Sequence, residues 1–230
     1  MSNEHNISVI TIDGPSGTGK GTLCHMLAKK LNWNFLDSGA IYRVLAYAAI
    51  KSNIDLNDVD SLVELANQLD LRFDVDKTQS SIVILDEKII SNEIRKESTG
   101  QNASKIAAIP EVRHALLERQ RAFATPPGLV TDGRDMGTVV FPKAKLKIFL
   151  YASDEERANR RYLQLKESGN NASLAQVMEE LLKRDARDTA RSHSPLLPAV
   201  DAIKLDTTGL TIAQVFANVL QLTNDRLNCN

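Results

Sequence analysis

Short apolar runs alternate with helical stripes of apolar residues along most of the chain. A run at 7–12 precedes a glycine-rich turn, and Leu23, Leu27 and Leu31 then recur at helical spacing. The same alternation predicts strands at 35–36, 129–131, 145–151 and 202–205 and helices at 40–50, 59–69, 92–108, 110–124, 154–167, 173–190 and 212–227. Strands that alternate with helices predict an α/β fold, with a parallel sheet that carries helices on both faces.

One region departs from this alternation. Short alternating strands are predicted at 71–75, 81–85 and 88–90, and residues 77–80 and 86–87 supply the turns between them. Three consecutive short strands indicate a small antiparallel meander, inserted into the larger fold as a satellite domain.

Two helices begin with a recognisable capping box. Ser173 and Gln176 form the first, and Thr211 and Gln214 form the second. Ser38 is placed to cap the helix at 40–50.

Length and charge exclude several classes of protein. A chain of 230 residues builds one good core with a satellite domain, and a net charge of -1 argues against a nucleic-acid or membrane surface. Cys24 and Cys229 lie far apart and are expected to be reduced thiols. With no apolar span and no targeting segment, we expect a cytoplasmic protein.

The turn after the first strand carries the strongest chemical signal. It is the run Gly14-Pro15-Ser16-Gly17-Thr18-Gly19-Lys20-Gly21-Thr22. Between a strand and a helix, such a loop surrounds the phosphates of a nucleoside triphosphate with backbone N–H groups, and Lys20 reaches the β and γ oxygens. The residue after the lysine is Gly21 rather than Ser or Thr, so Thr22 is the nearest hydroxyl.

Two further strands end in polar corners that contain glycine. The first is Asp37-Ser38-Gly39, with Arg43 nearby, and the second is Asp132-Gly133-Arg134-Asp135-Met136-Gly137. Ligands of open α/β sheets bind at the carboxyl ends of strands, so both corners are candidate sites. A helix cap with a surface salt bridge is the alternative for the first corner.

Arginines cluster on two predicted helices. Arg157, Arg160 and Arg161 share one helix face, and Arg184, Arg187 and Arg191 form a stripe on another helix. Guanidinium groups fork onto two phosphate oxygens and keep their charge, which suits phosphoryl transfer. The alternative for the first set is a solvated face paired with Glu155 and Glu156, a pairing that contributes only about 0 to 1 kcal/mol.

Three blocks of the chain together resemble bacterial cytidylate kinases, within the nucleoside monophosphate kinases. They are Ile10–Gly17 with Lys20-Gly21-Thr22, then Leu36–Arg43, then Asp132–Pro142. The resemblance covers nearly the whole chain, and Gly21-Thr22 after the lysine is part of the family pattern.

The resemblance implies a three-part enzyme that transfers the γ-phosphate of ATP to CMP or dCMP with Mg²⁺. The expected parts are a core at 1–37, 125–153 and 172–230, a monophosphate-binding region at 38–124 and a lid at 154–171. We expect a monomer that binds ATP and CMP, with no nucleic-acid or membrane partner.

Residue roles follow from the matching motifs. ATP is expected on 14–22, and Lys20, Arg157, Arg161 and Arg187 are the expected catalytic cations. The expected CMP-binding residues are Ser38, Arg43, Ser104, Arg113, Arg134, Asp135, Arg184, Asp188 and Arg191. Thr22 and Asp132 are the candidate Mg²⁺ ligands, acting through water.

Two other functions fit the phosphate loop by itself. One is a P-loop kinase that acts on another monophosphate or on a metabolite alcohol. The other is a nucleotide switch that phosphorylates no acceptor, although the chain has no Asn-Lys-x-Asp run to read guanine.

Overall fold

The computed structural model describes residues 7–75, 81–167, 169 and 171–228, so the turn expected at 77–80 and Cys229 lie outside the described residues. These residues divide into two compact units. Unit 1 comprises residues 1–37 and 121–230, and unit 2 comprises residues 38–120. The division of the chain into core, monophosphate-binding region and lid stays a prediction.

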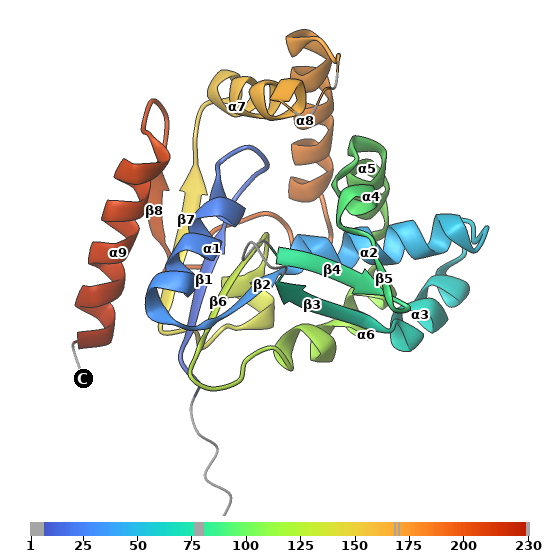
Figure 1. Cartoon of the computed structure of the whole chain (residues 1–230), viewed down its shortest axis with the longest axis horizontal. Coiled ribbons are helices and arrows are strands. Elements are labelled where there is room, and N and C mark those ends of the chain that lie inside the picture. The colour runs from blue at the N-terminus through green and yellow to red at the C-terminus, as the bar shows by residue number, and fades with distance from the viewer. Residues whose placement is uncertain (1–6, 76–80, 168, 170, 229–230) are drawn as a thin grey trace, which may run out of the picture. The chain divides into compact units, whose positions relative to one another are not determined.

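Unit 1 is built on a five-stranded parallel sheet. Its strands lie in the order β2 (Asn34–Asp37), β6 (Leu129–Gly133), β1 (Val9–Asp13), β7 (Leu146–Tyr151) and β8 (Ile203–Asp206) (Figure 1). Every residue of β1 and β6 is buried, as expected for central strands of a parallel sheet. The α/β fold predicted from the alternating pattern is therefore confirmed.

Unit 1 carries four α-helices among its described residues. They are α1 (Lys20–Leu31), α7 (Asp154–Glu167), α8 (Leu174–Thr189) and α9 (Ile212–Asn228). Helices α1 and α9 contribute apolar residues to the core on this sheet, while α7 and α8 pack against each other. Leu23 and Leu27 of α1 share one core cluster with Ile10 and Ile12 of β1 and with Val219 of α9. The helical spacing of Leu23, Leu27 and Leu31 predicted that these leucines form the buried face of α1. Their burial holds the start of α1 beside the end of β1.

Unit 2 contains five helices among its described residues and a small sheet of its own. The helices are α2 (Ser38–Lys51), α3 (Val59–Gln68), α4 (Ser91–Arg95), α5 (Glu97–Ile106) and α6 (Pro110–Arg121), whose last residue falls in unit 1. The strands β3 (Leu71–Val75), β4 (Ser81–Leu85) and β5 (Lys88–Ile89) pair antiparallel in that order. The predicted meander is therefore confirmed.

The single helix predicted at 92–108 is wrong, because the chain breaks at Lys96. Lys96 has an extended backbone (φ -58°, ψ 145°) between α4 and α5. Arg43 of α2 donates to the carbonyls of Ile94 (2.8 Å) and Lys96 (3.3 Å) beside the break. A side chain from another helix thus satisfies carbonyl groups that the periodicity alone assigned to a continuous helix.

Of the helix caps predicted from the sequence, the two capping boxes are present and the Ser38 cap is not. Both capping boxes are confirmed, at Ser173 with Gln176 and at Thr211 with Gln214. Ser38 is not a cap: it is the first residue of α2, and its hydroxyl donates to the buried Gln120 side chain at 2.8 Å.

The residues after β6 form an element that the pattern did not indicate. Met136–Val140 is a short π-helix, η1, between β6 and β7. The polar corner expected at 132–137 therefore continues into a turn with unusual hydrogen bonding, of the kind frequently found at functional sites.

Candidate active site

The phosphate loop has the strand-loop-helix setting that its spacing predicted. It joins β1 to α1, and Gly17 and Gly19 adopt positive φ of 81° and 82°. A Cβ atom at Gly14 would lie 2.2 Å from the carbonyl oxygen of Leu150, so only glycine fits there. Gly19 caps α1 without a side chain, which leaves the first N–H groups of the helix available to an anion.

Lys20 is the first residue of α1 and is buried. Its ammonium donates to the carbonyl of Pro15 at 2.8 Å, which curls the side chain back over the loop. Burial and the positive charge of Arg134 lower the pKa of Lys20 to about 7, although Asp132 raises it in part. A polyphosphate bound at the loop would stabilise the charged ammonium.

Asp132, at the end of β6, is a buried carboxylate with an unsatisfied oxygen. Its Oδ1 atom has no hydrogen-bond partner. Burial and the nearby Asp37 raise the pKa of Asp132 well above its usual range. A divalent cation would both satisfy this oxygen and favour the ionised form, so the residue fits the Mg²⁺ expected there.

The other candidate Mg²⁺ ligand, Thr22, is exposed on the first turn of α1. Among the described residues, no group of three or more His, Cys, Asp or Glu side chains is arranged to hold a metal. Magnesium often keeps several waters and binds through one or two carboxylates plus nucleotide phosphates, so one carboxylate such as Asp132 is enough for the proposed site.

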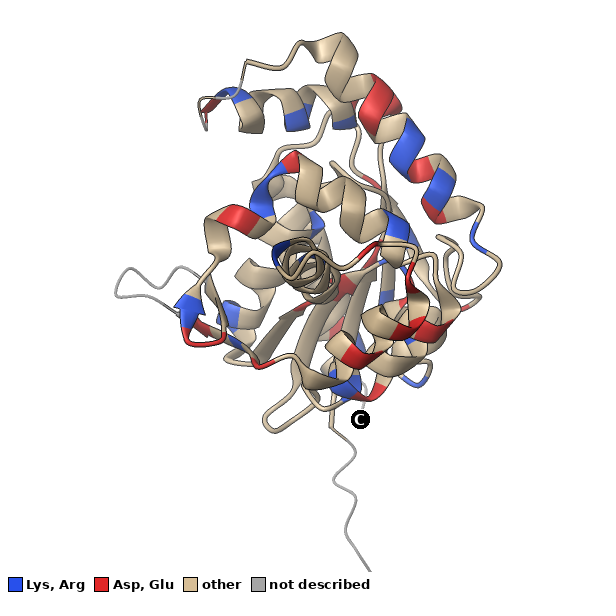
Figure 2. Ribbon diagram, turned by 90° about the vertical axis from the view of Figure 1, so that its right-hand side faces the viewer, with Lys and Arg blue, Asp and Glu red and all other residues tan. Residues whose placement is uncertain are grey.

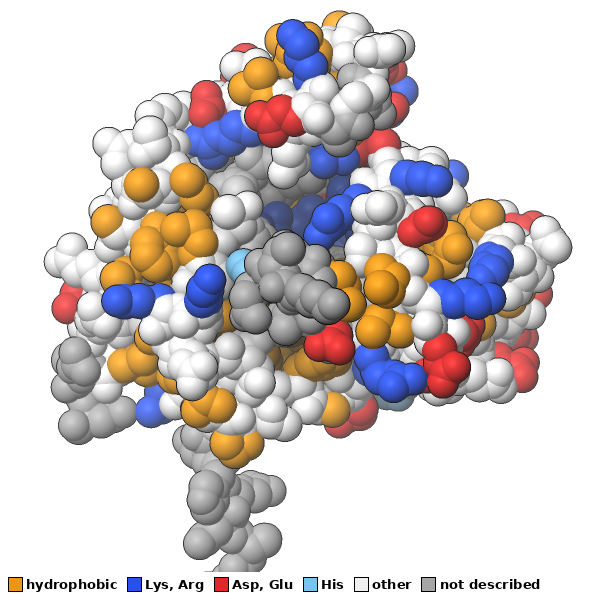
Figure 3. Space-filling view, viewed as in Figure 1, with side chains coloured by type: hydrophobic (Ala, Val, Ile, Leu, Met, Phe, Trp, Pro, Cys, Tyr) orange, Lys and Arg blue, Asp and Glu red, His pale blue; other side chains and the backbone are white. Residues whose placement is uncertain are grey.

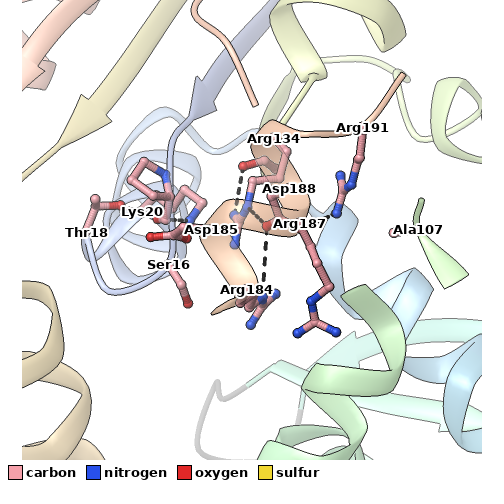
Figure 4. Close-up of polar contacts among 12 residues, drawn as sticks. Ser16, Thr18, Lys20, Ala107, Arg134, Arg184, Asp185, Arg187, Asp188 and Arg191 are labelled. Atoms are coloured by element: carbon pink, nitrogen blue, oxygen red, sulfur yellow. Dashed lines mark hydrogen bonds and ion pairs between the residues drawn. The ribbon is translucent and has the colours of Figure 1, made fainter. Parts of the chain in front are cut away.

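A buried carboxylate on α8 gathers arginines from two segments. Asp188 accepts from Arg134 Nε at 2.9 Å and pairs with Arg191, and Arg184 Nε lies 4.0 Å away (Figure 4). Burial alone would raise the pKa of Asp188, but the charges of these arginines lower it to about 2. Three cations that repel one another are thereby held together on one acid.

The segment that carries Arg134 and Asp135 is fastened to β1. Both carboxylate oxygens of Asp13 accept backbone N–H groups, one from Met136 at 2.9 Å and one from Gly137 at 2.8 Å. Burial raises the pKa of Asp13 to about 6 despite these bonds. Asp135 is also buried and stands at the start of η1, directly before the two bonded amides.

Arg157 lies against the phosphate loop instead of pointing out from the first turn of α7. Its guanidinium donates to the carbonyl of Ser16 at 2.9 Å and pairs with Asp154 and Asp185. The solvated face considered for α7 is therefore wrong for this residue, whose side chain is buried.

The remaining arginines of the two helices have different surroundings. Arg160 binds Glu156 and donates to the carbonyl of Thr207 at 2.6 Å, whereas Arg161 donates to Gln164. Arg187 reaches the carbonyl of Lys183 at 3.4 Å. Positive and negative residues alternate along α8, the helix that descends at the upper right of Figure 2.

Four of the predicted CMP-binding residues belong to unit 2. Arg113 donates to the carbonyl of Ala107 at 3.1 Å, and its guanidinium lies 5.4 Å from the ring centre of Tyr42. Arg43 and Ser38 make the bonds described above, and Ser104 is buried on α5. A Cβ atom at Gly100 would lie 2.7 Å from the Arg43 guanidinium, so the glycine makes room for it.

Charged side chains of both signs are interspersed over the face shown in Figure 3. Within the described part of the chain, no helix combines the length and apolar character that crossing a bilayer requires.

Comparison with known proteins identifies the family. A model of the cytidylate kinase family matches residues 10–225. A protein named cytidylate kinase from Stutzerimonas stutzeri (strain A1501) is 54% identical over 221 residues, which are 96% of this chain and 96% of that protein. The chain belongs to the cytidylate kinase family. Proteins of the same name from Yersinia enterocolitica and Photobacterium profundum are 56% and 58% identical, over 92% and 91% of each chain.

Membership of the cytidylate kinase family confirms the resemblance carried by the three sequence blocks. The protein is a P-loop kinase and therefore a phosphotransferase.

Two acidic residues of this cytidylate kinase family member are absent from the predicted site. Asp13 ends the first strand, and Asp185 lies within the arginine stripe of α8. Each residue has a sequence feature that points to a role: Asp13 is an acid at the end of a buried strand, and Asp185 is an acid among the arginines of α8. Their partners lie 123 and 28 residues away, so spacing did not reveal them.

Proposed function

We propose that the protein transfers the γ-phosphoryl group of ATP to CMP or dCMP, giving ADP and CDP or dCDP. The observation that carries this proposal is the phosphate loop with its buried Lys20, in a chain more than half identical over at least 91% of its length to proteins named cytidylate kinase. The transfer is direct and in line, without a phosphorylated enzyme.

ATP binds at residues 14–22. The glycine-rich turn and the uncapped start of α1 present backbone N–H groups to the phosphates, and the Lys20 ammonium reaches the β and γ oxygens. Arg161 and Arg187 are the cations proposed to approach the transferred group, where charge neutralisation accounts for most of the catalysis.

Mg²⁺ bound with ATP would neutralise charge on its phosphates. Asp132 would hold the ion through water, which would satisfy the otherwise unpaired Oδ1 atom, and Thr22 is the nearest hydroxyl of the loop.

The residues proposed to bind CMP keep the roles that the family motifs assign to them. In unit 1, Arg134 contacts the acceptor phosphate, Asp135 accepts from the ribose hydroxyls with help from Arg184, and Arg191 assists with the base. Asp188 contributes by holding these arginines in place. In unit 2, Ser38 and Arg43 bind the phosphate, and Ser104 and Arg113 read the cytosine.

An acceptor panel tests this function. ADP release with ATP and Mg²⁺ is measured for CMP, dCMP, UMP, AMP and shikimate, and we expect the highest kcat/KM with CMP and dCMP. Lys20→Ala should reduce the rate to less than about a tenth while the circular dichroism spectrum stays unchanged, because contacts to transition-state charge are worth orders of magnitude. A preference for shikimate or AMP contradicts the proposed acceptor, and nucleotide binding without transfer indicates a switch.

A further inference from the structure

The Arg157 guanidinium contacts four acceptors from three parts of unit 1. Nε donates to the carbonyl of Ala152 at 3.3 Å, and Nη1 donates to the carbonyl of Ser16 at 2.9 Å. Ion pairs to Asp154 and Asp185 complete the set, and the side chain is 4% exposed. These contacts direct the guanidinium at protein acceptors, which favours a supporting role over contact with a phosphoryl group.

The phosphate loop also touches the backbone of α7 at this point. A Cβ atom at Gly17 would lie 2.7 Å from the Arg157 carbonyl oxygen and 2.8 Å from its Cβ. The loop and the first turn of α7 are therefore in van der Waals contact, and the Ser16 bond fastens them together.

Asp185 joins α8 to the same arrangement. Its Oδ2 atom pairs with Arg157, while its Oδ1 atom is buried without a hydrogen-bond partner. Figure 4 shows its carboxylate beside Ser16 and Lys20 of the loop. A negative charge this close to the loop opposes the binding of an anion, so its presence calls for a structural reason.

We propose that Arg157 and Asp185 are positioning residues that hold the donor loop, residues 14–19, in the shape that binds ATP. Arg157 acts through the Ser16 carbonyl, and Asp185 acts by fixing the Arg157 guanidinium. This role replaces the direct phosphoryl contact expected for Arg157 from its place in the lid segment. The inference rests on the proposed function only in taking ATP as the donor.

The substitution Asp185→Asn separates this role from simple electrostatics by the sign of its effect. Removing a negative charge near Lys20 would tighten ATP binding if charge alone mattered. Loss of the pair to Arg157 frees the loop, and we expect the Kd of ATP to rise at least about fivefold. The measurement is titration calorimetry with ATP and Mg²⁺ in the absence of any acceptor.

A second variant, Arg157→Lys, keeps the positive charge but removes the forked guanidinium group. A single ammonium cannot reach all four acceptors. We expect the Kd of ATP to rise at least about fivefold, while the Kd of CMP, measured separately, changes less than about twofold. If Asp185→Asn does not fold, as judged by circular dichroism, this variant carries the test.

Lys183→Gln is the matched control, because it breaks an exposed pair with Glu179 on the same helix α8. Its ATP affinity should equal that of the wild type. An unchanged or tighter Kd in Asp185→Asn, or a loss of kcat in Arg157→Lys with unchanged ATP affinity, overturns the proposal. The ATP affinities of Asp185→Asn and Arg157→Lys are measured without an acceptor, so these results stand even if the acceptor proves to be a molecule other than CMP.

Discussion

At the scale of single residues, several buried charged side chains are paired, and some of their partners lie far away in the sequence. Asp188 illustrates the physics: burial opposes its ionisation, yet Arg134, Arg191 and Arg184 lower its pKa to about 2. The acid stays ionised at neutral pH, and it lets cations share a small volume. Its influence on the site is therefore both structural and electrostatic.

Asp188→Asn should reduce the free energy of unfolding by about 2 kcal/mol at pH 7, from a pKa lowered from 3.8 to about 2. A pKa lowered by folding contributes stability that is present above the unfolded pKa and is lost as the pH falls through the folded one. Urea unfolding should therefore show a constant difference between pH 7 and about pH 5, and a shrinking difference below about pH 4. A difference that does not depend on pH contradicts this account.

Asp135→Ala tests the division between acceptor and donor residues. Asp135 is buried beside η1, and we propose that it accepts from the ribose hydroxyls of CMP. The variant should weaken CMP binding at least about tenfold and ATP binding less than about twofold, because loss of a bond to a charged group costs about 1.5 to 3 kcal/mol. Separate calorimetric titrations check this, and equal effects on both nucleotides would place Asp135 at the metal instead.

At the scale of elements, the short π-helix η1 converts the end of β6 into a rigid support for Arg134 and Asp135. Its first two N–H groups are held by Asp13 on the neighbouring strand. At its other end the Arg121 side chain donates to the carbonyl of Val140 at 3.1 Å. The element is thus anchored by side chains at both ends, in addition to its own backbone hydrogen bonds.

Asp13→Asn should disturb this support, because the amide N–H₂ then faces one of the two backbone N–H groups. An unsatisfied buried N–H costs about 1 to 3 kcal/mol, so we expect CMP affinity to fall at least about fivefold and to a greater extent than ATP affinity. Calorimetry with each nucleotide is the measurement. Asp206→Asn is the control, since this acid also ends a strand of the sheet but is exposed; a fall in ATP affinity alone would refute the prediction.

At the scale of the whole molecule, the phosphate loop lies entirely in unit 1, whereas the residues proposed for CMP are divided between the two units. The proposed donor site therefore contains no residue of unit 2. We expect acceptor binding to come before transfer and to exclude water.

ATP hydrolysis provides a check at this scale. Without CMP, we expect ADP release at less than about one hundredth of the rate seen with CMP, because the transfer-competent arrangement needs the acceptor. A coupled assay with and without CMP measures both rates. Comparable rates would mean that the phosphate loop and its arginines activate water by themselves.

The sequence by itself determined the α/β class, the phosphate loop, the antiparallel meander and the cytidylate kinase family. Each depends on local physics: apolar periodicity, glycine at positions with positive φ, and motif spacing are all written within a few residues. The same reasoning selected Lys20 and the arginines of α7 and α8, because their residue types suit phosphate chemistry wherever the fold places them.

Only the tertiary structure decided which charges meet. The pairing of Asp13 with η1, of Asp185 with Arg157 and of Ser38 with Gln120 joins segments that are 28 to 124 residues apart. Tertiary contacts also interrupt the helix predicted at 92–108, where Arg43 donates hydrogen bonds to the carbonyl groups at the break. Burial strengthens these long-range pairs and makes an unpaired group costly, and burial is a property of the packed chain that no local pattern contains.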